Sequence, residues 1–552
     1  MSIHIGRFAA FLLVISLAGC GSSFDVQSQS IAPPVNQASP IEQAFVDDPG
    51  PGLETVPTGH LNPLSRPDPA DVVVIPVADL ESDYETLFCS LSDTLNVTES
   101  TPECVQNVAF IKSQSGTGNF DLNAQPIVNN PLGVTGVSFQ TLEYDTTVSL
   151  PEGVRSFHVS GGLLMPVGIS ADQVKGIIVY FHGTTFNKSQ VGSSYDGSIE
   201  TRLNAQVFAS QGYVVAIPDY VGQGVDWQNV HPYVLYPEVS AQTAADMLTA
   251  IRPLVVTQLG LTPQELPLKL FSAGYSEGGS YSLWFNSYLS ENPDRLDATY
   301  QLTHSVGMEG AYSTSEVIYD YLFENVGKRG GNEFNIQTLS LTNFVKPLLS
   351  ADAFLSYATY SLGGDFNAVF NQDFFNMNAT PPIPQAAVNV DGEQVDIASA
   401  FARESTQIAP QLALAGLGKS ANGATYPGLL EILVSSQNSV NSLVSPLILS
   451  ETFQNQLIDT LEAADADLSS VADGGVSIIT LDQDSVVPPN NFDLLLSEYP
   501  EKIRNAIKID HTQLVVVSPY SGITGEAQWV PIDHLNGPAY EFLYALNIFN
   551  QF

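Results

Sequence analysis

The pentapeptide Gly-Tyr-Ser-Glu-Gly at residues 274–278 constrains the fold more than any other part of the sequence. An apolar run of strand type at 268–271 precedes it, and residues 279–285 can begin a helix. Glycines at both ends of the pentapeptide permit a sharp strand-to-helix turn in which the two backbones approach closely. Such a turn strains its central residue and projects the hydroxyl group of Ser276 away from the sheet. The pattern, in this context, predicts an exposed nucleophilic serine rather than a Gly/Ser loop without chemistry.

Apolar runs alternate with helix-like segments along much of the chain. Continuous apolar runs, typical of strands buried on both faces of a sheet, occur at 176–181, 213–218 and 476–481. Helices that alternate with them are expected at 198–210, 240–258 and 539–549. This alternation favours parallel strands with helical connections. We therefore predict an α/β fold with a mostly parallel central sheet flanked by helices.

Residues 311–465 interrupt this alternation. They contain helix-like segments between stretches rich in Asn, Phe and Tyr, and they predict a large, mainly helical cap or lid inserted into the core. The core would then form in two parts, 166–310 and 466–552. An N-terminal extension at 67–165 would carry the first, antiparallel strands. The apolar residues of the cap could cover an apolar pocket, or they could form an ordinary core.

The first residues have the pattern of an export signal. Arg7 precedes a short apolar stretch at 8–17, and the sequence Leu-Ala-Gly-Cys that ends at Cys20 resembles the lipobox of bacterial lipoproteins. The resemblance implies a signal peptide at 1–19, a lipid on Cys20 and anchoring in the cell envelope. Gly21 occupies the position where an aspartate would favour retention at the inner membrane, so the outer membrane is expected, with either face open. The alternative is an ordinary cleaved signal with a stray cysteine.

The remaining N-terminal residues predict a tether and a disulfide. Residues 20–66 are rich in Ser, Gln, Pro and Asp, which is typical of a flexible linker. With Cys20 acylated, Cys89 and Cys104 are the two cysteines left. In an oxidising compartment they would pair and close a short loop, whereas free buried thiols are the alternative.

The charge of the chain limits its partners. It has 58 acidic and 18 basic residues and a formal net charge of −40. Nucleic-acid binding requires a basic surface, so a nucleic-acid partner is excluded. Electrostatic attraction to anionic lipids is also disfavoured. The lipid anchor is therefore the expected contact with a membrane.

Three further segments support a family resemblance. They are His-Gly-Thr-Thr at 182–185, the segment 218–224, and His-Pro-Tyr at 231–233. Together with the pentapeptide at 274–278, they resemble α/β-hydrolases of the secretory lipase and esterase type. The resemblance covers the two parts of the predicted core, but neither the cap nor the N-terminal region. It implies hydrolysis of carboxylic esters through an acyl-serine, without metal or organic cofactor, on a small-molecule or lipid ester.

A serine nucleophile needs a base, and the base needs an acid that orients it. In α/β-hydrolases the acid follows the serine in the chain. Asp484 and Asp482 both lie just after the predicted strand 476–481. The spacing Asp-x-x-Val-Pro that begins at Asp484 resembles the acid loop of many α/β-hydrolases. We therefore predict Asp484 as the acid and keep Asp482 as the alternative.

Three histidines follow the serine. His304 precedes both candidate acids and breaks the expected order. His511 lies in a segment that reads as the last strand or its edge, where a lone histidine is more often structural. His534 lies in a loop just before the last predicted helix, where this fold places its base. We predict His534 as the base.

The oxyanion of an acyl-transfer intermediate needs two N–H donors. The backbone amide of Glu277, directly after the serine, should supply one. The loop at 182–185 should supply the other, and we choose Thr184. His182 is interpreted as structural, and so are Asp219 and His231, which lie in a loop that frequently shapes the site in such enzymes.

Two alternative functions remain. A serine peptidase of the prolyl-oligopeptidase type has the same triad in the same order, but such enzymes usually carry a β-propeller, and no repeat of blade length occurs here. A non-catalytic surface protein on a hydrolase fold would have lost at least one triad residue. Acyl-chain length, alcohol preference and oligomeric state stay open.

Overall fold

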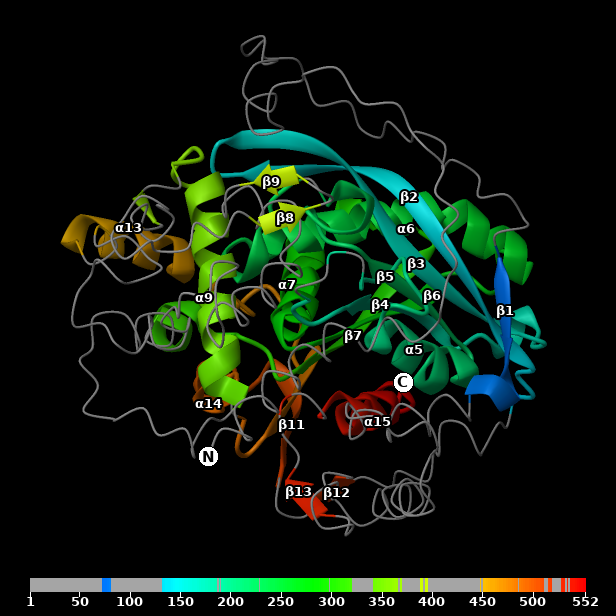
Figure 1. Ribbon diagram of the computed structural model, residues 1–552. Helices are drawn as coiled ribbons and strands as arrows, with labels where there is room; N and C mark the ends of the chain where they lie inside the picture. Colours follow the sequence, from blue (N-terminus) through cyan, green and yellow to red (C-terminus); the bar gives the residue numbers. More distant parts are fainter. Residues whose placement is uncertain are drawn as a thin grey trace, which may run out of the picture.

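The computed structural model of the chain is shown in Figure 1. It describes residues 72–80, 132–319 apart from 186, 187, 189, 228 and 297, 341–365, 368–369, 388–390, 393–395, 447, 450–510 apart from 485, 515–518, 528–531, 534 and 537–552. Three groups of predictions lie outside these residues: the signal, lipid anchor and linker that include Cys20, the Cys89–Cys104 disulfide, and His511. Much of the predicted cap also lies outside them.

A nine-stranded sheet forms the centre of the described chain, in the order β1-β2-β3-β5-β4-β6-β7-β10-β11. The first three pairs in this order, β1–β2, β2–β3 and β3–β5, are antiparallel. The remaining pairs, β5–β4, β4–β6, β6–β7, β7–β10 and β10–β11, are parallel. The strands are β1 (Val73–Pro76), β2 (Gly136–Leu150), β3 (Gly153–Val167), β4 (Gly176–Phe181), β5 (Tyr213–Pro218), β6 (Leu268–Tyr275), β7 (Tyr300–Met308), β10 (Val476–Leu481) and β11 (Ile503–Ile509). The mostly parallel central sheet predicted from the sequence is thereby confirmed.

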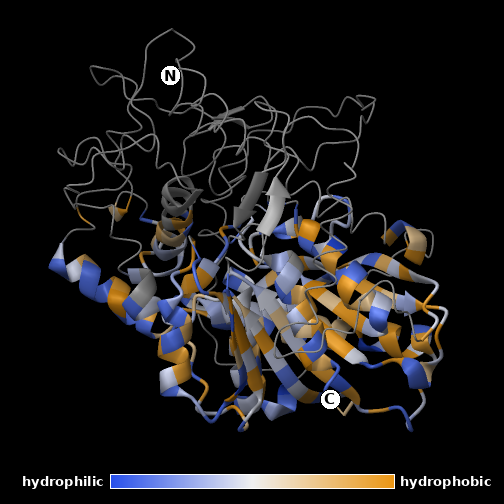
Figure 2. Cartoon of the chain, turned by 90° about the horizontal axis from the view of Figure 1, so that it is seen from below, coloured by the Kyte–Doolittle hydropathy of each residue, from blue (hydrophilic) through white to orange (hydrophobic). Residues whose placement is uncertain are grey.

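Helices cover both faces of this sheet (Figure 1). They are α5 (Ile199–Val207), α6 (Pro237–Leu259), α7 (Glu277–Glu291), α14 (Asn490–Glu498) and α15 (Pro538–Phe549). In β4, Ile177 and Val179 pack on the side of α6 and α7, whereas Ile178 and Tyr180 pack on the side of α5 and α15. Successive side chains of a strand point to opposite faces, so a strand covered on both sides is apolar throughout. Figure 2 shows hydrophobic residues concentrated along the strands.

The carboxyl ends of β4 and β6 meet at one place on the sheet edge. The chain passes from β4 to β5 on one side and then returns to place β6 on the other side of β4. A crevice outside the strand ends is expected where strand order reverses in this way. Phe181 at the end of β4 lies in register with Gly274 of β6. The loop at 182–185 and the serine turn therefore begin side by side.

Part of the predicted cap region is described. It contains the helices α9 (Leu341–Tyr360) and α13 (Glu451–Glu462), and the two-stranded sheet of β8 (Val388–Val390) and β9 (Glu393–Val395). The rings of Tyr357 in α9 and Phe453 in α13 lie 5.3 Å apart. Tyr236 and Ser361 join the end of α9 to the loop before α6 by a hydrogen bond of 2.6 Å. These helices are thus attached to the core close to the strand ends. A second small sheet joins β12 (Val515–Ser518) and β13 (Gln528–Pro531). Among the described helices, none has both the length and the apolar character needed to cross a membrane.

Candidate active site

Ser276 occupies the turn between β6 and α7 with a positive φ of 55°. Few residues other than glycine adopt such a φ, so the backbone here is strained and held by its surroundings. Its amide N donates a 2.8 Å hydrogen bond to the carbonyl of Met308 in β7. A Cβ at Gly274 would lie 2.0 Å from the carbonyl oxygen of Gly278, and one at Gly278 would lie 2.0 Å from that of Phe181. Both glycines are therefore required by close backbone contact.

His534 lies between Ser276 and Asp484. Its Nε2 is 2.8 Å from the Oγ of Ser276, and its Nδ1 is 2.5 Å from an oxygen of Asp484. The other oxygen of Asp484 accepts hydrogen bonds from the amides of Val486 and Val487, at 2.6 and 2.9 Å. The carboxylate fixes the proton on Nδ1, so Nε2 faces the serine as an acceptor. The three side chains predicted from the sequence are thus brought together in one hydrogen-bonded series.

These groups are shielded from solvent, which affects the acid. The side chains of His534 and Asp484 are 6% and 0% exposed. Burial alone would raise the pKa of Asp484, but the contact with His534 outweighs it, and the pKa lies below the usual value. Asp484 is therefore ionised at neutral pH and can stabilise a positive charge on His534. A hydrogen bond of 2.6 Å from the hydroxyl of Tyr275 to the backbone carbonyl of His534 joins His534 to the end of β6.

The competing candidates lie elsewhere, as far as they are described. Asp482 is exposed at the end of β10. His304 lies in β7, where its Nε2 is 2.8 Å from the hydroxyl of Ser477 and its ring lies 4.7 Å from that of Phe552. Its contacts are those of a structural histidine. His511 lies outside the described residues.

The loop at 182–185 lies against the serine turn. A Cβ at Gly183 would lie 3.5 Å from the Cβ of Ser276. The hydroxyl of Thr184 donates a 2.9 Å hydrogen bond to the carboxylate of Glu277. His182 packs on the ring of Tyr220 at 4.1 Å, and burial lowers its pKa to about 4. A neutral, stacked imidazole agrees with the structural interpretation of His182.

Comparisons with known proteins add resemblances of fold only. No protein-family model and no curated protein sequence matches the chain. Similar solved structures include a Legionella pneumophila protein described as a hydrolase, with 20% identity, a TM-score of 0.46, and 75% of this chain and 89% of that chain covered. They also include the rice cell wall degrading esterase LipA from Xanthomonas oryzae, with 17% identity, a TM-score of 0.43, and 72% and 86% covered. A third is Candida antarctica lipase A, with 14% identity, a TM-score of 0.38, and 67% and 71% covered. At these values we draw no conclusion about activity or substrate from them.

Two buried acids next to Asp484 were missed by the sequence analysis. Glu309 follows β7 with a positive φ of 49° and accepts a 2.8 Å hydrogen bond from the hydroxyl of Thr480. Burial raises its pKa well above the usual range, and Glu541 and Asp484 add to that effect. Burial also raises the pKa of Glu541, in α15, to about 8. Both acids are therefore neutral at pH 7, which leaves Asp484 as the charged member of the cluster.

The same cluster is the candidate for metal binding. Among the described residues, Glu309, Asp484 and His534 offer ligand atoms within 4.8 Å of one another. The hydrogen bond between Asp484 and His534 and the neutral state of Glu309 account for this spacing without an ion. A metal ligand would have to be ionised, which disfavours Glu309 in that role.

Replacing Glu541 by glutamine is expected to increase stability at alkaline pH. The usual pKa of a glutamate is about 4.3, and that of folded Glu541 is about 8, so between these values the unfolded chain has lost a proton that the folded chain keeps. The free energy of unfolding then falls with rising pH by about 1.4 kcal/mol per unit, or roughly 4 kcal/mol by pH 8. Urea unfolding at pH 6 and pH 8 should show a smaller decrease for Glu541→Gln than for the parent. Exposed Glu462 in α13 provides the matched control, Glu462→Gln. Equal decreases in all three proteins would contradict the neutral state of Glu541.

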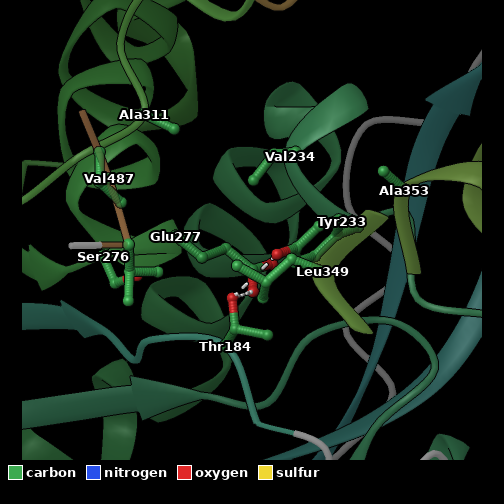
Figure 3. A pocket seen from close by; sticks show the side chains of 10 residues that line it. Thr184, Tyr233, Val234, Ser276, Glu277, Ala311, Leu349, Ala353 and Val487 are labelled. Carbon is green, nitrogen blue, oxygen red and sulfur yellow. Dashed lines mark hydrogen bonds between the residues drawn. The ribbon is translucent and has the colours of Figure 1, made fainter. Parts of the chain in front are cut away.

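A pocket lies beside Ser276, which is one of its lining residues (Figure 3). It encloses about 440 Å³, including its opening to solvent. Its walls are lined by Thr184, Tyr233, Val234, Ser276, Glu277, Ala311, Leu349, Ala353, Val486 and Val487. Leu349 and Ala353 come from α9, so the cap region contributes to this pocket. Apart from Tyr233 and the polar groups around the serine, the lining is aliphatic, which suits the hydrocarbon part of a substrate.

Proposed function

We propose that this protein is a serine hydrolase that cleaves carboxylic esters through an acyl-serine intermediate. The observation that carries the proposal is the position of His534, whose ring joins Ser276 at 2.8 Å and Asp484 at 2.5 Å. Nucleophile, base and acid in hydrogen-bond contact are the requirement for activating a serine hydroxyl. Their chain order, Ser276, Asp484, His534, is the order of α/β-hydrolases.

The proposed reaction has two halves. Ser276 attacks the ester carbonyl while His534 takes the hydroxyl proton, and His534 then gives this proton to the leaving alcohol. The amides of Thr184 and Glu277 stabilise the oxyanion, which is supported by the contact of the 182–185 loop with the serine turn. Water then repeats the cycle on the acyl-enzyme. Neither a metal nor an organic cofactor takes part in these steps.

The proposed substrate is an ester with an apolar chain. The aliphatic side chains of Val234, Leu349, Val486 and Val487 line the pocket beside Ser276. A peptide substrate would present polar amide groups to these surfaces, at a cost in desolvation. The lining therefore favours an acyl or alkyl group over a peptide.

The test is hydrolysis of p-nitrophenyl esters from acetate to palmitate by the purified protein, together with labelling by a fluorophosphonate. Ester hydrolysis and stoichiometric labelling of Ser276 are expected, and the optimum acyl length separates an esterase from a lipase. Labelling without ester hydrolysis, but with cleavage of a prolyl p-nitroanilide, would replace the proposal by the peptidase alternative. A folded protein with neither labelling nor hydrolysis would indicate a non-catalytic role.

We also propose that the protein is held in the cell envelope by a lipid on Cys20. The sequence Leu-Ala-Gly-Cys that ends at Cys20, after the apolar stretch at 8–17, supports this proposal. In a bacterial host grown with labelled palmitate, the full chain should incorporate label and fractionate with the outer membrane. The Cys20→Ala variant should do neither. Equal labelling of both proteins would overturn the assignment of Cys20.

A further inference from the structure

The carboxylate of Glu277 is buried beside the serine and fully engaged. Its side chain is 1% exposed. One oxygen accepts hydrogen bonds from the Nε2 of His231 at 2.5 Å and from the hydroxyl of Tyr281 at 2.7 Å. The other oxygen accepts from the hydroxyl of Thr184 at 2.9 Å. Glu277 thus links the helix that begins after Ser276 to the 182–185 loop.

The hydrogen bonds of His231 determine its charge. Its Nδ1 lies 3.1 Å from the carbonyl oxygen of Val221, which can only accept a hydrogen bond. Its Nε2 faces the carboxylate of Glu277. Burial alone would raise the pKa of Glu277, but this pKa lies below its usual value, and three donors surround the carboxylate: His231, Tyr281 and Thr184. Each ring nitrogen of His231 therefore faces an acceptor, the arrangement in which an imidazolium donates two hydrogen bonds.

The surroundings of His231 suit a cation. Its ring is stacked on that of Tyr220, with centroids 5.1 Å apart and planes at 10°. An aromatic face attracts a positive charge at this distance. The nearest histidine neighbour in the same stack, His182, is neutral because burial lowers its pKa to about 4. Tyr220 is thus stacked with both imidazoles.

The charge of the Glu277 side chain conflicts with the role proposed for its backbone amide, and His231 can balance that charge. Its backbone amide is a proposed oxyanion donor, whereas its side chain places a negative charge in the same residue. Inside a site with little water, an unbalanced charge there would repel the oxyanion as it develops. The imidazolium of His231 balances this charge. The carboxylate can then accept the hydrogen bond from Thr184, the residue proposed to supply the second donor, without an unbalanced negative charge in the site.

We infer that His231 and Glu277 form a buried ion pair that positions the two oxyanion donors and balances charge beside the serine. This inference rests on the proposed function and extends it to two positioning residues. The sequence analysis had interpreted His231 as structural. We therefore expect the charges at these two positions, and not only the packing of the two side chains, to control the rate of the chemical step.

Charge-balancing variants test the inference. His231→Gln leaves the carboxylate of Glu277 unbalanced, and we expect kcat to fall about 100-fold with KM changed less than threefold, a loss similar to that of one oxyanion donor. The double variant His231→Gln/Glu277→Gln removes both charges, and its kcat should exceed that of His231→Gln at least tenfold. Thr184→Val removes the hydroxyl bonded to Glu277 without changing charge, and kcat should fall about tenfold. Each is measured with the p-nitrophenyl ester that the parent hydrolyses fastest, and with the rate of fluorophosphonate labelling.

The controls separate the possible failures. His158 lies between Asp145 and Glu143 on the exposed face of β2 and β3, at 2.8 and 3.0 Å, so His158→Gln removes a similar contact that involves no residue lining the pocket and should retain full activity. Thermal unfolding followed by circular dichroism identifies a variant that does not fold, and Thr184→Val then provides the test. A double variant no more active than His231→Gln would overturn the ion pair, as would an unchanged kcat in His231→Gln. A parent without ester hydrolysis or labelling would contradict the proposed function instead.

Discussion

Replacing Ser276 by alanine is expected to remove ester hydrolysis, with a decrease in kcat on the order of 10⁶-fold. The change deletes the oxygen that lies 2.8 Å from the Nε2 of His534 and leaves the base without a nucleophile to activate. Alanine adds no volume at the turn, where the backbone is held by the amide bond of residue 276 to Met308. The fold should therefore be preserved. Initial rates with the best p-nitrophenyl ester, at enzyme concentrations high enough to detect a 10⁶-fold loss, measure this effect.

The matched control is Ser287→Ala. Ser287 is a buried serine on the same helix, α7, and donates a 2.6 Å hydrogen bond to the carbonyl of Asp467, away from the pocket. Its loss should cost stability and leave kcat unchanged. Retention of more than 1% of the parental kcat by Ser276→Ala would place the nucleophile elsewhere. Labelling by fluorophosphonate should disappear with Ser276→Ala and persist with Ser287→Ala.

Replacing Asp484 by asparagine is expected to lower kcat about 10⁴-fold. The amides of Val486 and Val487 both donate to one oxygen of Asp484, so the carbonyl oxygen of an asparagine would stay at that position. Its NH₂ group would then face the Nδ1 of His534 as a donor. The proton of the imidazole would move to Nε2, which could no longer accept the proton of Ser276. The loss arises from the wrong tautomer and not from a change of shape.

Asp482→Asn is the control for this variant, because Asp482 is exposed two residues earlier in the chain. Its kcat should stay within about twofold of the parent, because exposed charges contribute little at a distance. The pH dependence of kcat adds a second readout, since Asp484→Asn removes the charge that favours the protonated form of His534. A large loss in Asp482→Asn with little loss in Asp484→Asn would transfer the role of the acid to Asp482.

The strands that could be predicted from the sequence are those that are buried along their whole length. The predicted strands at 176–181, 213–218 and 476–481 coincide with β4, β5 and β10, since each is buried at every position. The hairpin of β2 and β3 was only indicated, because exposed polar residues interrupt much of it. β11 was missed apart from its end, since exposed and half-buried positions lie between its buried ends.

In the candidate site, too, some residues could be predicted from their neighbours in the sequence and others could not. Ser276, Asp484 and His534 carry local patterns, a turn and two loops in a fixed order, and could be named in advance. The roles of Glu309, Glu541 and His231 depend on contacts between segments far apart in the chain, and nothing in their neighbouring residues indicates a buried carboxyl group or an imidazolium. Such groups become visible only when burial and hydrogen-bond partners are known.

The sheet order has a consequence for the synthesis of the protein. β10 pairs with β7 and brings Asp484, but it follows Ser276 in the chain by the whole segment 311–465. While the ribosome is still translating that segment, the emerged chain contains Ser276 and neither Asp484 nor His534. The proposed triad is therefore completed late, after β10 has paired with β7 and His534 has reached Ser276. With the function proposed above, an unfinished chain would not hydrolyse esters in the compartment where it is made.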